Sequence, residues 1–233
     1  MEERPRVTRT GRHVRPRNHA IDSFRAERGR KAQVEPVLKA DGVCKRYGRH
    51  QVLDSVSFSV SAGRSLAIVG ANGCGKSTLL KICVGMLSPD AGSITVRGHL
   101  GYCPQSADLG SFLTPDNHFT WFGSGHGLGR ARSNQEGANI ASSLNWQVVD
   151  KQVRYLSGGT AQKLNVTCAI LGRPDVILLD EPYQGFDEGS YLDFWDLVES
   201  WCDKGAGVVI VTHMLRELHR VHDVLDLSPR AAA

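Results

Sequence analysis

The sequence lacks long hydrophobic runs and paired cysteines. No stretch approaches the roughly 18 consecutive apolar residues that a membrane-spanning helix needs, so work at a membrane would require a partner chain. The six cysteines are scattered, without a C-x-x-C pair or histidines at zinc-finger spacing. We therefore expect reduced thiols and a cytosolic protein. The basic N-terminus has no apolar segment before a small-residue cleavage site, which argues against a secretory signal.

Excess positive charge is confined to the N-terminus. Residues 1–35 hold ten Lys or Arg against five Asp or Glu, whereas the remainder holds 18 against 19, so the formal net charge of +4 belongs to this segment. We expect residues 1–35 to be a disordered, solvated tail, with contact to acidic lipid headgroups as the alternative. Residues 36–230 are expected to form one domain. Its charge balance gives no reason to expect nucleic-acid binding.

Residues 70–78 match the phosphate-binding pattern G-x-x-x-x-G-K-[ST]. In such a loop glycines let backbone amides turn toward phosphate oxygens, a lysine neutralises the β and γ phosphates, and a hydroxyl reaches Mg²⁺. The lysine here is Lys76 and the hydroxyl belongs to Ser77. The predicted nucleotide-binding residues of the loop are Gly70, Ala71, Asn72, Gly73, Cys74, Gly75, Lys76, Ser77 and Thr78.

The surrounding pattern predicts an α/β fold. Three short apolar runs, at 66–69, 176–179 and 208–211, are typical of parallel strands buried on both faces. A helix is expected from Lys76, with apolar residues at helical spacing as far as Met86 and an end near Gly85. Alternating residues from 53 to 60 and a strand at 94–96, after a turn at 88–93, predict an antiparallel sheet beside the nucleotide.

Polar residues directly follow the later two buried strands. Asp180 suits a Mg²⁺ ligand, and Glu181 could orient or deprotonate an attacking water. His213 could contact the γ-phosphate or that water. Ligands of open α/β sheets bind at the carboxyl ends of the strands, so these side chains are expected to converge with the phosphate loop.

A second anion site is predicted where a helix follows Leu156-Ser157-Gly158-Gly159-Thr160. By itself Ser-Gly-Gly is a weak signal. The helix is expected to place Ala161, Leu164, Cys168 and Leu171 on one face.

Together these motifs resemble those of the nucleotide-binding subunit of an ATP-binding cassette (ABC) transporter. The phosphate loop, a Gln-containing loop at 102–105, the Leu-Ser-Gly-Gly signature, the Asp-Glu-Pro strand end and a switch histidine occur in the order of that family, over roughly residues 37–227. The resemblance implies a P-loop NTPase core with a mainly parallel buried sheet, an antiparallel β subdomain and a helical signature subdomain at about 106–160. It also implies an ATPase that uses ATP and Mg²⁺.

The resemblance assigns further roles. Tyr47 would stack on adenine, and Gln105 would contact Mg²⁺ and the attacking water. The family pattern places Asp187 at the dimer interface, Glu181 as the catalytic carboxylate, and Lys76 and His213 beside the γ-phosphate. The residues that would reach the γ-phosphate of a second copy in a head-to-tail dimer are the trans signature residues Ser157, Gly158 and Gly159.

Two segments depart from the family pattern. Thr160 stands where the signature more often has Gln, and residues 183–187 read Tyr-Gln-Gly-Phe-Asp in place of the usual Ser-Ala-Leu-Asp type. Residues 106–155 are poor in apolar runs and broken by four glycines between 123 and 129, so helices there are weakly signalled.

The expected function is ATP hydrolysis that energises a separate integral membrane permease, with a second copy or a homologous cassette as dimer partner. The chain would then lie in the cytoplasm, on the inner face of the cell membrane. Export is favoured by Thr160, by residues 183–187 and by the lack of a C-terminal regulatory domain. The main alternative is a soluble ABC-type ATPase acting on ribosomes or nucleic acid; a kinase or GTPase would have no use for Leu-Ser-Gly-Gly.

Overall fold

The computed structural model describes residues 35–106, 109–214 and 216–228. The predicted tail at 1–35 lies outside these residues except for Glu35. Within the described ranges, no helix is both long enough and apolar enough to cross a membrane.

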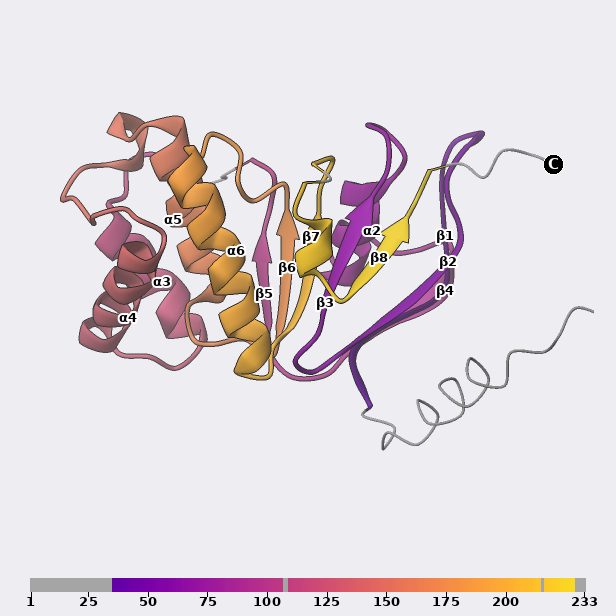
Figure 1. The fold of residues 1–233 in the computed structure, drawn as a ribbon, viewed down its shortest axis with the longest axis horizontal. Coiled ribbons are helices and arrows are strands. Elements are labelled where there is room, and N and C mark those ends of the chain that lie inside the picture. The colour runs from indigo at the N-terminus through magenta and orange to yellow at the C-terminus, as the bar shows by residue number, and fades with distance from the viewer. Residues whose placement is uncertain (1–34, 107–108, 215, 229–233) are drawn as a thin grey trace, which may run out of the picture. The chain divides into compact units, whose positions relative to one another are not determined.

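A five-stranded parallel sheet forms the centre of the fold, in the order β5-β6-β7-β3-β8 (Figure 1). Every residue of β3, β6 and β7 is buried, which confirms the three strands predicted from apolar runs. The two edge strands were not predicted, because both are short and β8 is mostly exposed, so neither has an apolar run. The strands are β3 (Ser65–Val69), β5 (Leu100–Cys103), β6 (Val176–Asp180), β7 (Gly207–Val211) and β8 (Asp223–Asp226).

A separate antiparallel sheet has the order β2-β1-β4. Its strands are β1 (Pro36–Tyr47), β2 (His50–Ser61) and β4 (Ala91–Val96). The turn predicted at 88–93 is therefore shorter than expected, since β4 already begins at Ala91. A bulge lies at Gly42, whose φ of 58° favours glycine, and Ser55 on the paired strand also has a positive φ.

The described residues contain five α-helices and two 3-10 turns. Helix α2 packs with the antiparallel sheet on one face of the parallel sheet, whereas α5 and α6 pack on the other face (Figure 1). Two apolar cores therefore enclose the parallel sheet. The bounds are α2 (Lys76–Cys83), α3 (Pro115–Gly125), α4 (Arg130–Ser143), η2 (Val153–Tyr155), α5 (Gly158–Ile170), α6 (Glu188–Asp203) and η3 (Leu218–Arg220).

The glycine-rich segment, in which helices were only weakly signalled, contains α3 and α4. Thr114 caps α3 in a capping box with Asn117. The glycines allow close packing: a Cβ at Gly137 would lie 2.4 Å from the Phe119 ring, and one at Gly123 would lie 2.1 Å from the Ser133 hydroxyl oxygen. These glycines are contact points between two helices, and only the folded structure distinguishes that role from a turn.

Two helices can be compared with their expected apolar residues. Helix α5 does not have a single apolar face, because every residue from Gln162 to Ile170 is buried between the sheet and neighbouring helices. Helix α2 ends at Cys83, close to the expected end near Gly85, which lies just beyond the cap at a φ of 76°. Met86 lies outside the helix and is 70% exposed.

Candidate functional site

Half of the predicted site residues line one cavity of about 370 Å³ at the carboxyl ends of β3 and β6. This volume is within the range of small-molecule sites. The cavity is lined by His50, Val52, Asn72, Gly73, Gly75, Lys76, Ser77, Thr78, Gln105, Asp180 and Glu181.

Glycine geometry shapes the loop between β3 and α2. Gly70, Gly73 and Gly75 have φ values of 143°, 82° and 103°, which L side chains rarely adopt. A Cβ on Gly75 would also lie 2.9 Å from the carbonyl oxygen of Val52. Gly75 caps α2 without a side-chain hydrogen bond, so the first amides of the helix are open to an anion.

Lys76 folds back over this loop. Its ammonium group donates hydrogen bonds to the carbonyl oxygens of Gly70, at 2.7 Å, and Ala71, at 3.1 Å. Only 7% of the residue is exposed. A lysine has three N–H donors, so one remains for a bound anion while the other two keep the charge above the loop.

Two buried carboxyl groups face the loop from the end of β6. Asp180 Oδ1 and Glu181 Oε2 are both buried, with no hydrogen-bond partner among the described residues. Burial raises the pKa of Asp180, and a hydrogen bond from Ser77 opposes that rise. Buried carboxylate oxygens without partners, next to a serine hydroxyl, are suitable ligands for a hard cation, so the residues fit the expected Mg²⁺.

Glu181 also contacts His213, the residue that follows β7 and Thr212. The Nδ1 atom of His213 lies 2.8 Å from Glu181 Oε1. Glu181 has a φ of 48°, a conformation uncommon outside glycine, and its amide donates to the Val211 carbonyl oxygen at 3.0 Å. The carboxyl side chain is 7% exposed, while the imidazole is 57% exposed. A buried carboxylate thus holds an accessible imidazole beside the cavity.

Tyr47, which was expected to stack on the base, lies outside the cavity lining. This residue pairs with His50 at the end of the β1–β2 hairpin, is 52% exposed and does not line the cavity. His50 and Val52 line it and were missed, because only the hairpin brings β2 to the phosphate loop. Gln105 lines the cavity from the segment after β5 and is exposed.

The predicted signature and interface residues lie outside this cavity. Ser157 is exposed and caps α5 by accepting a hydrogen bond from the Thr160 amide at 3.1 Å, and Gly158 is exposed beside it. Asp187 caps α6 through Ser190. The two caps lie close together: a Cβ on Gly159, next to the first cap, would be only 2.3 Å from the carbonyl oxygen of Gly185, which precedes the second.

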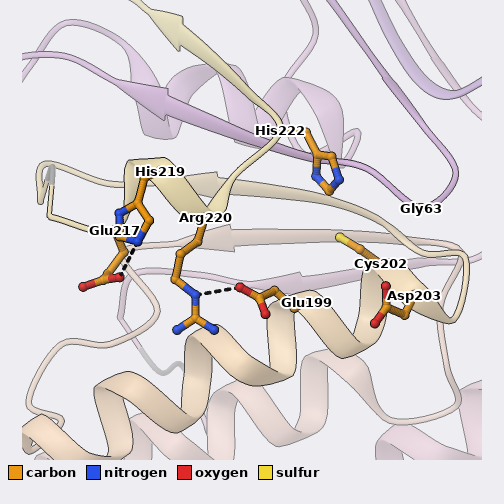
Figure 2. Close-up of a pocket in the computed structure, with 8 residues that line it drawn as sticks. All are labelled: Gly63, Glu199, Cys202, Asp203, Glu217, His219, Arg220 and His222. Carbon is orange, nitrogen blue, oxygen red and sulfur yellow. Dashed lines mark hydrogen bonds and ion pairs between the residues drawn. The ribbon is translucent and has the colours of Figure 1, made fainter.

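A larger hollow of about 700 Å³ lies at the amino-terminal ends of β3 and β8, near the end of α6 (Figure 2). Figure 2 shows Arg220 directed to Glu199 and His219 directed to Glu217. None of the predicted site residues lines it. Among the residues described by the structure, no cluster of three His, Cys, Asp or Glu side chains is arranged to hold a metal. The predicted chemistry therefore gathers at the smaller cavity.

Comparisons with known proteins agree with this geometry. Residues 53–184 match the family model described as ABC transporter. The chain is 34% identical over 204 residues to Nod factor export ATP-binding protein I of Ralstonia nicotianae. The matched region covers 82% of this chain and 63% of that relative. It is 37% identical over 196 residues to zinc import ATP-binding protein ZnuC of Paramagnetospirillum magneticum, covering 82% and 71%. The chain thus spans less than two thirds of the first relative's length.

Solved structures resemble the fold as a whole. The chain has a TM-score of 0.75 with a structure described as the ATP binding subunit of an ABC transporter, at 25% identity, covering 84% of this chain and 88% of that one. The TM-score with a nucleotide-free ATP-binding cassette from an ABC transporter is 0.70 at 23% identity, covering 84% and 90%. The predicted P-loop core, with its parallel and antiparallel sheets, is confirmed.

Proposed function

The chain belongs to the ABC transporter family, and we propose that it binds MgATP and hydrolyses it to energise a separate membrane permease. The observation that carries the proposal is the convergence of Lys76, Ser77, Asp180 and Glu181 on one cavity beneath a glycine-rich loop. These groups supply a positive charge, a hydroxyl and two carboxylates, which is the set that phosphoryl transfer to water requires.

The predicted residues in and around the cavity have the following proposed roles. Loop amides and Lys76 hold the phosphate charge, and Tyr47 lies on the hairpin that would border the base. Glu181 orients the attacking water and takes its proton, while His213, held at 2.8 Å by that carboxylate, contacts the γ-phosphate. Ser77, Gln105 and Asp180 would hold Mg²⁺, which when bound neutralises charge on the phosphate oxygens.

The second half of each site is proposed to come from another copy or a homologous cassette. Ser157 and Gly158 are exposed at the start of α5, a helix of 13 residues whose amino-terminal end favours anions. Asp187 lies beside them across the Gly159–Gly185 contact. A head-to-tail dimer would place this end of α5 on the γ-phosphate bound by the partner.

We propose that the transporter exports its substrate. The chain itself would lie in the cytoplasm, on the inner face of the cell membrane. Relatives named for export support this direction: the Nod factor export ATP-binding proteins I of Ralstonia nicotianae and of Mesorhizobium japonicum, the latter 32% identical over 200 residues. A relative named for zinc import has higher identity, so identity does not decide the direction. Transport in inverted membrane vesicles carrying the permease tests this: ATP-dependent uptake supports export, and efflux contradicts it.

The activity itself is tested on the purified chain. MgATP should raise the melting temperature, and phosphate release should depend on Mg²⁺. Lys76→Ala should lose both effects, because it removes the charge held at the loop carbonyls. Co-purification with a polytopic membrane protein is expected; co-purification with ribosomes or nucleic acid in its place would contradict the transporter role.

A further inference from the structure

Two side-chain bridges join the segment after β6 to the segment after β7. The first is the contact between Glu181 and His213, at 2.8 Å. The second is a buried hydrogen bond between the hydroxyl groups of Tyr183 and Thr212, one residue before the histidine. The second bridge has no part in the chemistry described above.

The Thr212 hydroxyl shapes the turn that carries His213. The Thr212 amide is still bound to the Ile68 carbonyl oxygen of β3, at 3.1 Å. Its hydroxyl oxygen then accepts a hydrogen bond from the Met214 amide at 2.8 Å, and it lies 3.3 Å from the Met214 carbonyl oxygen. A threonine that binds the amide two residues ahead closes a local turn, and His213 is the central residue of that turn.

Tyr183 fixes this hydroxyl from a rigid position. The phenol of Tyr183 and the hydroxyl of Thr212 share this buried hydrogen bond, in which either group can be the donor. Burial raises the pKa of Tyr183, which keeps the phenol protonated. Its ring centroid lies 5.1 Å from that of Tyr191 and 5.7 Å from that of Phe194, both on α6. The phenol of Tyr183 is thereby anchored to a helix.

We propose that Tyr183 is a positioning residue for ATP hydrolysis, which acts through Thr212 to hold His213 against Glu181. The imidazole is more than half exposed, so packing does not fix its direction and the turn must do so. The inference rests on the proposed function, because it assigns Tyr183 to the reaction of the same site. It also links α6, whose N-cap residue is Asp187, to the histidine.

The test is Tyr183→Phe, which removes one hydroxyl and retains the ring. A hydrogen bond of ordinary strength corresponds to a fall in kcat of about three- to tenfold. The Kd for MgATP should stay within about twofold, since Tyr183 does not line the cavity. Tyr191→Phe is the matched control: its hydroxyl is buried in the same cluster and has no partner among the described residues, so kcat should not change.

Thr212 provides the complementary variants. Thr212→Val removes the hydroxyl and should lower kcat at least as much, whereas Thr212→Ser keeps it and should restore most of the rate. Combining Tyr183→Phe with Thr212→Val should give no further loss, because both break the same link. These variants also test the inference if Tyr183→Phe does not fold, which a melting curve reveals.

Three results would overturn the inference: a wild-type kcat in Tyr183→Phe, a wild-type kcat in Thr212→Val, or losses that multiply in the double variant. A wild-type chain that binds MgATP but releases no phosphate would be a different failure, that of the proposed function itself.

Discussion

The ammonium group of Lys163 lies 3.5 Å from the carboxylate of Asp187, and so links the signature helix α5 to the N-cap residue of α6. Lys163 is buried, and it also donates to the Ser190 hydroxyl at 2.5 Å and to the Asn145 carbonyl oxygen at 3.3 Å. The ammonium group thus has two hydrogen-bond acceptors, and its charge is paired with Asp187. The expected trans signature and the expected interface aspartate therefore form one connected unit within a single chain.

Removing the Asp187 cap should lower stability in a pH-dependent way. Hydrogen bonds from the amide and hydroxyl of Ser190 lower the pKa of Asp187 to about 2. A carboxyl group whose pKa is lower in the folded state than its usual value of about 3.9 stabilises the fold above that value, and the effect disappears as the pH falls through the folded pKa. Asp187→Ala should reduce the melting temperature by about 2–4 °C near neutral pH.

Thermal melts between about pH 7 and pH 2.5 test this. The difference in melting temperature between wild type and Asp187→Ala should be constant above about pH 5 and should decrease below about pH 4. Asp187→Asn is the control, because it keeps a capping oxygen without the charge. A difference in melting temperature that increases as the pH falls would contradict the capping role of the Asp187 carboxylate.

Adding one methyl group at Gly159 should disturb the contact between the two caps. Its Cβ would lie 2.3 Å from the Gly185 carbonyl oxygen. The backbone at Gly185 has a φ of 76°, so it cannot shift away without strain. Gly159→Ala should destabilise the fold by ~1–3 kcal/mol in urea unfolding. Gly158→Ala is the neighbouring control, since a Cβ there meets nothing within 4 Å, and its midpoint should be unchanged. Equal midpoints for both variants would refute the packing argument.

Replacing Glu181 with Gln should separate binding from turnover. The amide keeps the shape but cannot take a proton, so phosphate release should fall at least about a hundredfold, while the Kd for MgATP stays near the wild-type value. Binding and phosphate release are measured separately on the same preparation. Asp203→Asn, an exposed acid that lines the other hollow, should keep full activity. Normal hydrolysis in Glu181→Gln would remove the role assigned to this carboxylate.

Bound ATP should slow modification of Cys74 by a bulky thiol reagent, and complete modification should block hydrolysis. Burial raises the pKa of Cys83 to about 12 and also raises those of Cys103, Cys168 and Cys202, so these thiols stay protonated and unreactive. Labelling in a Cys44→Ser background therefore reports on Cys74, which is half-buried in the phosphate loop. The same labelling rate with and without ATP would show that the loop does not enclose the nucleotide as proposed.

Sequence reasoning predicted those parts of the fold and site that are encoded locally. Residues 70–78 carry their function in contiguous residue types, and the run 176–179 is apolar because β6 is buried on both faces. Helices α3 and α4 were weakly signalled, since close contacts such as Gly137 against Phe119 stabilise them more than helix propensity does. His50 was missed because its place depends on the hairpin turning β2 toward the loop.

The sequence by itself determined that this chain has a phosphate loop, carboxylates after a buried strand and the ordered motifs of its family. Only the tertiary structure decided which side chains meet. Glu181 contacts His213, and Tyr183 contacts Thr212, because β6 and β7 are neighbours in a parallel sheet and end at the same edge. Strand order arises from packing across the whole chain, and no local pattern of residues specifies it.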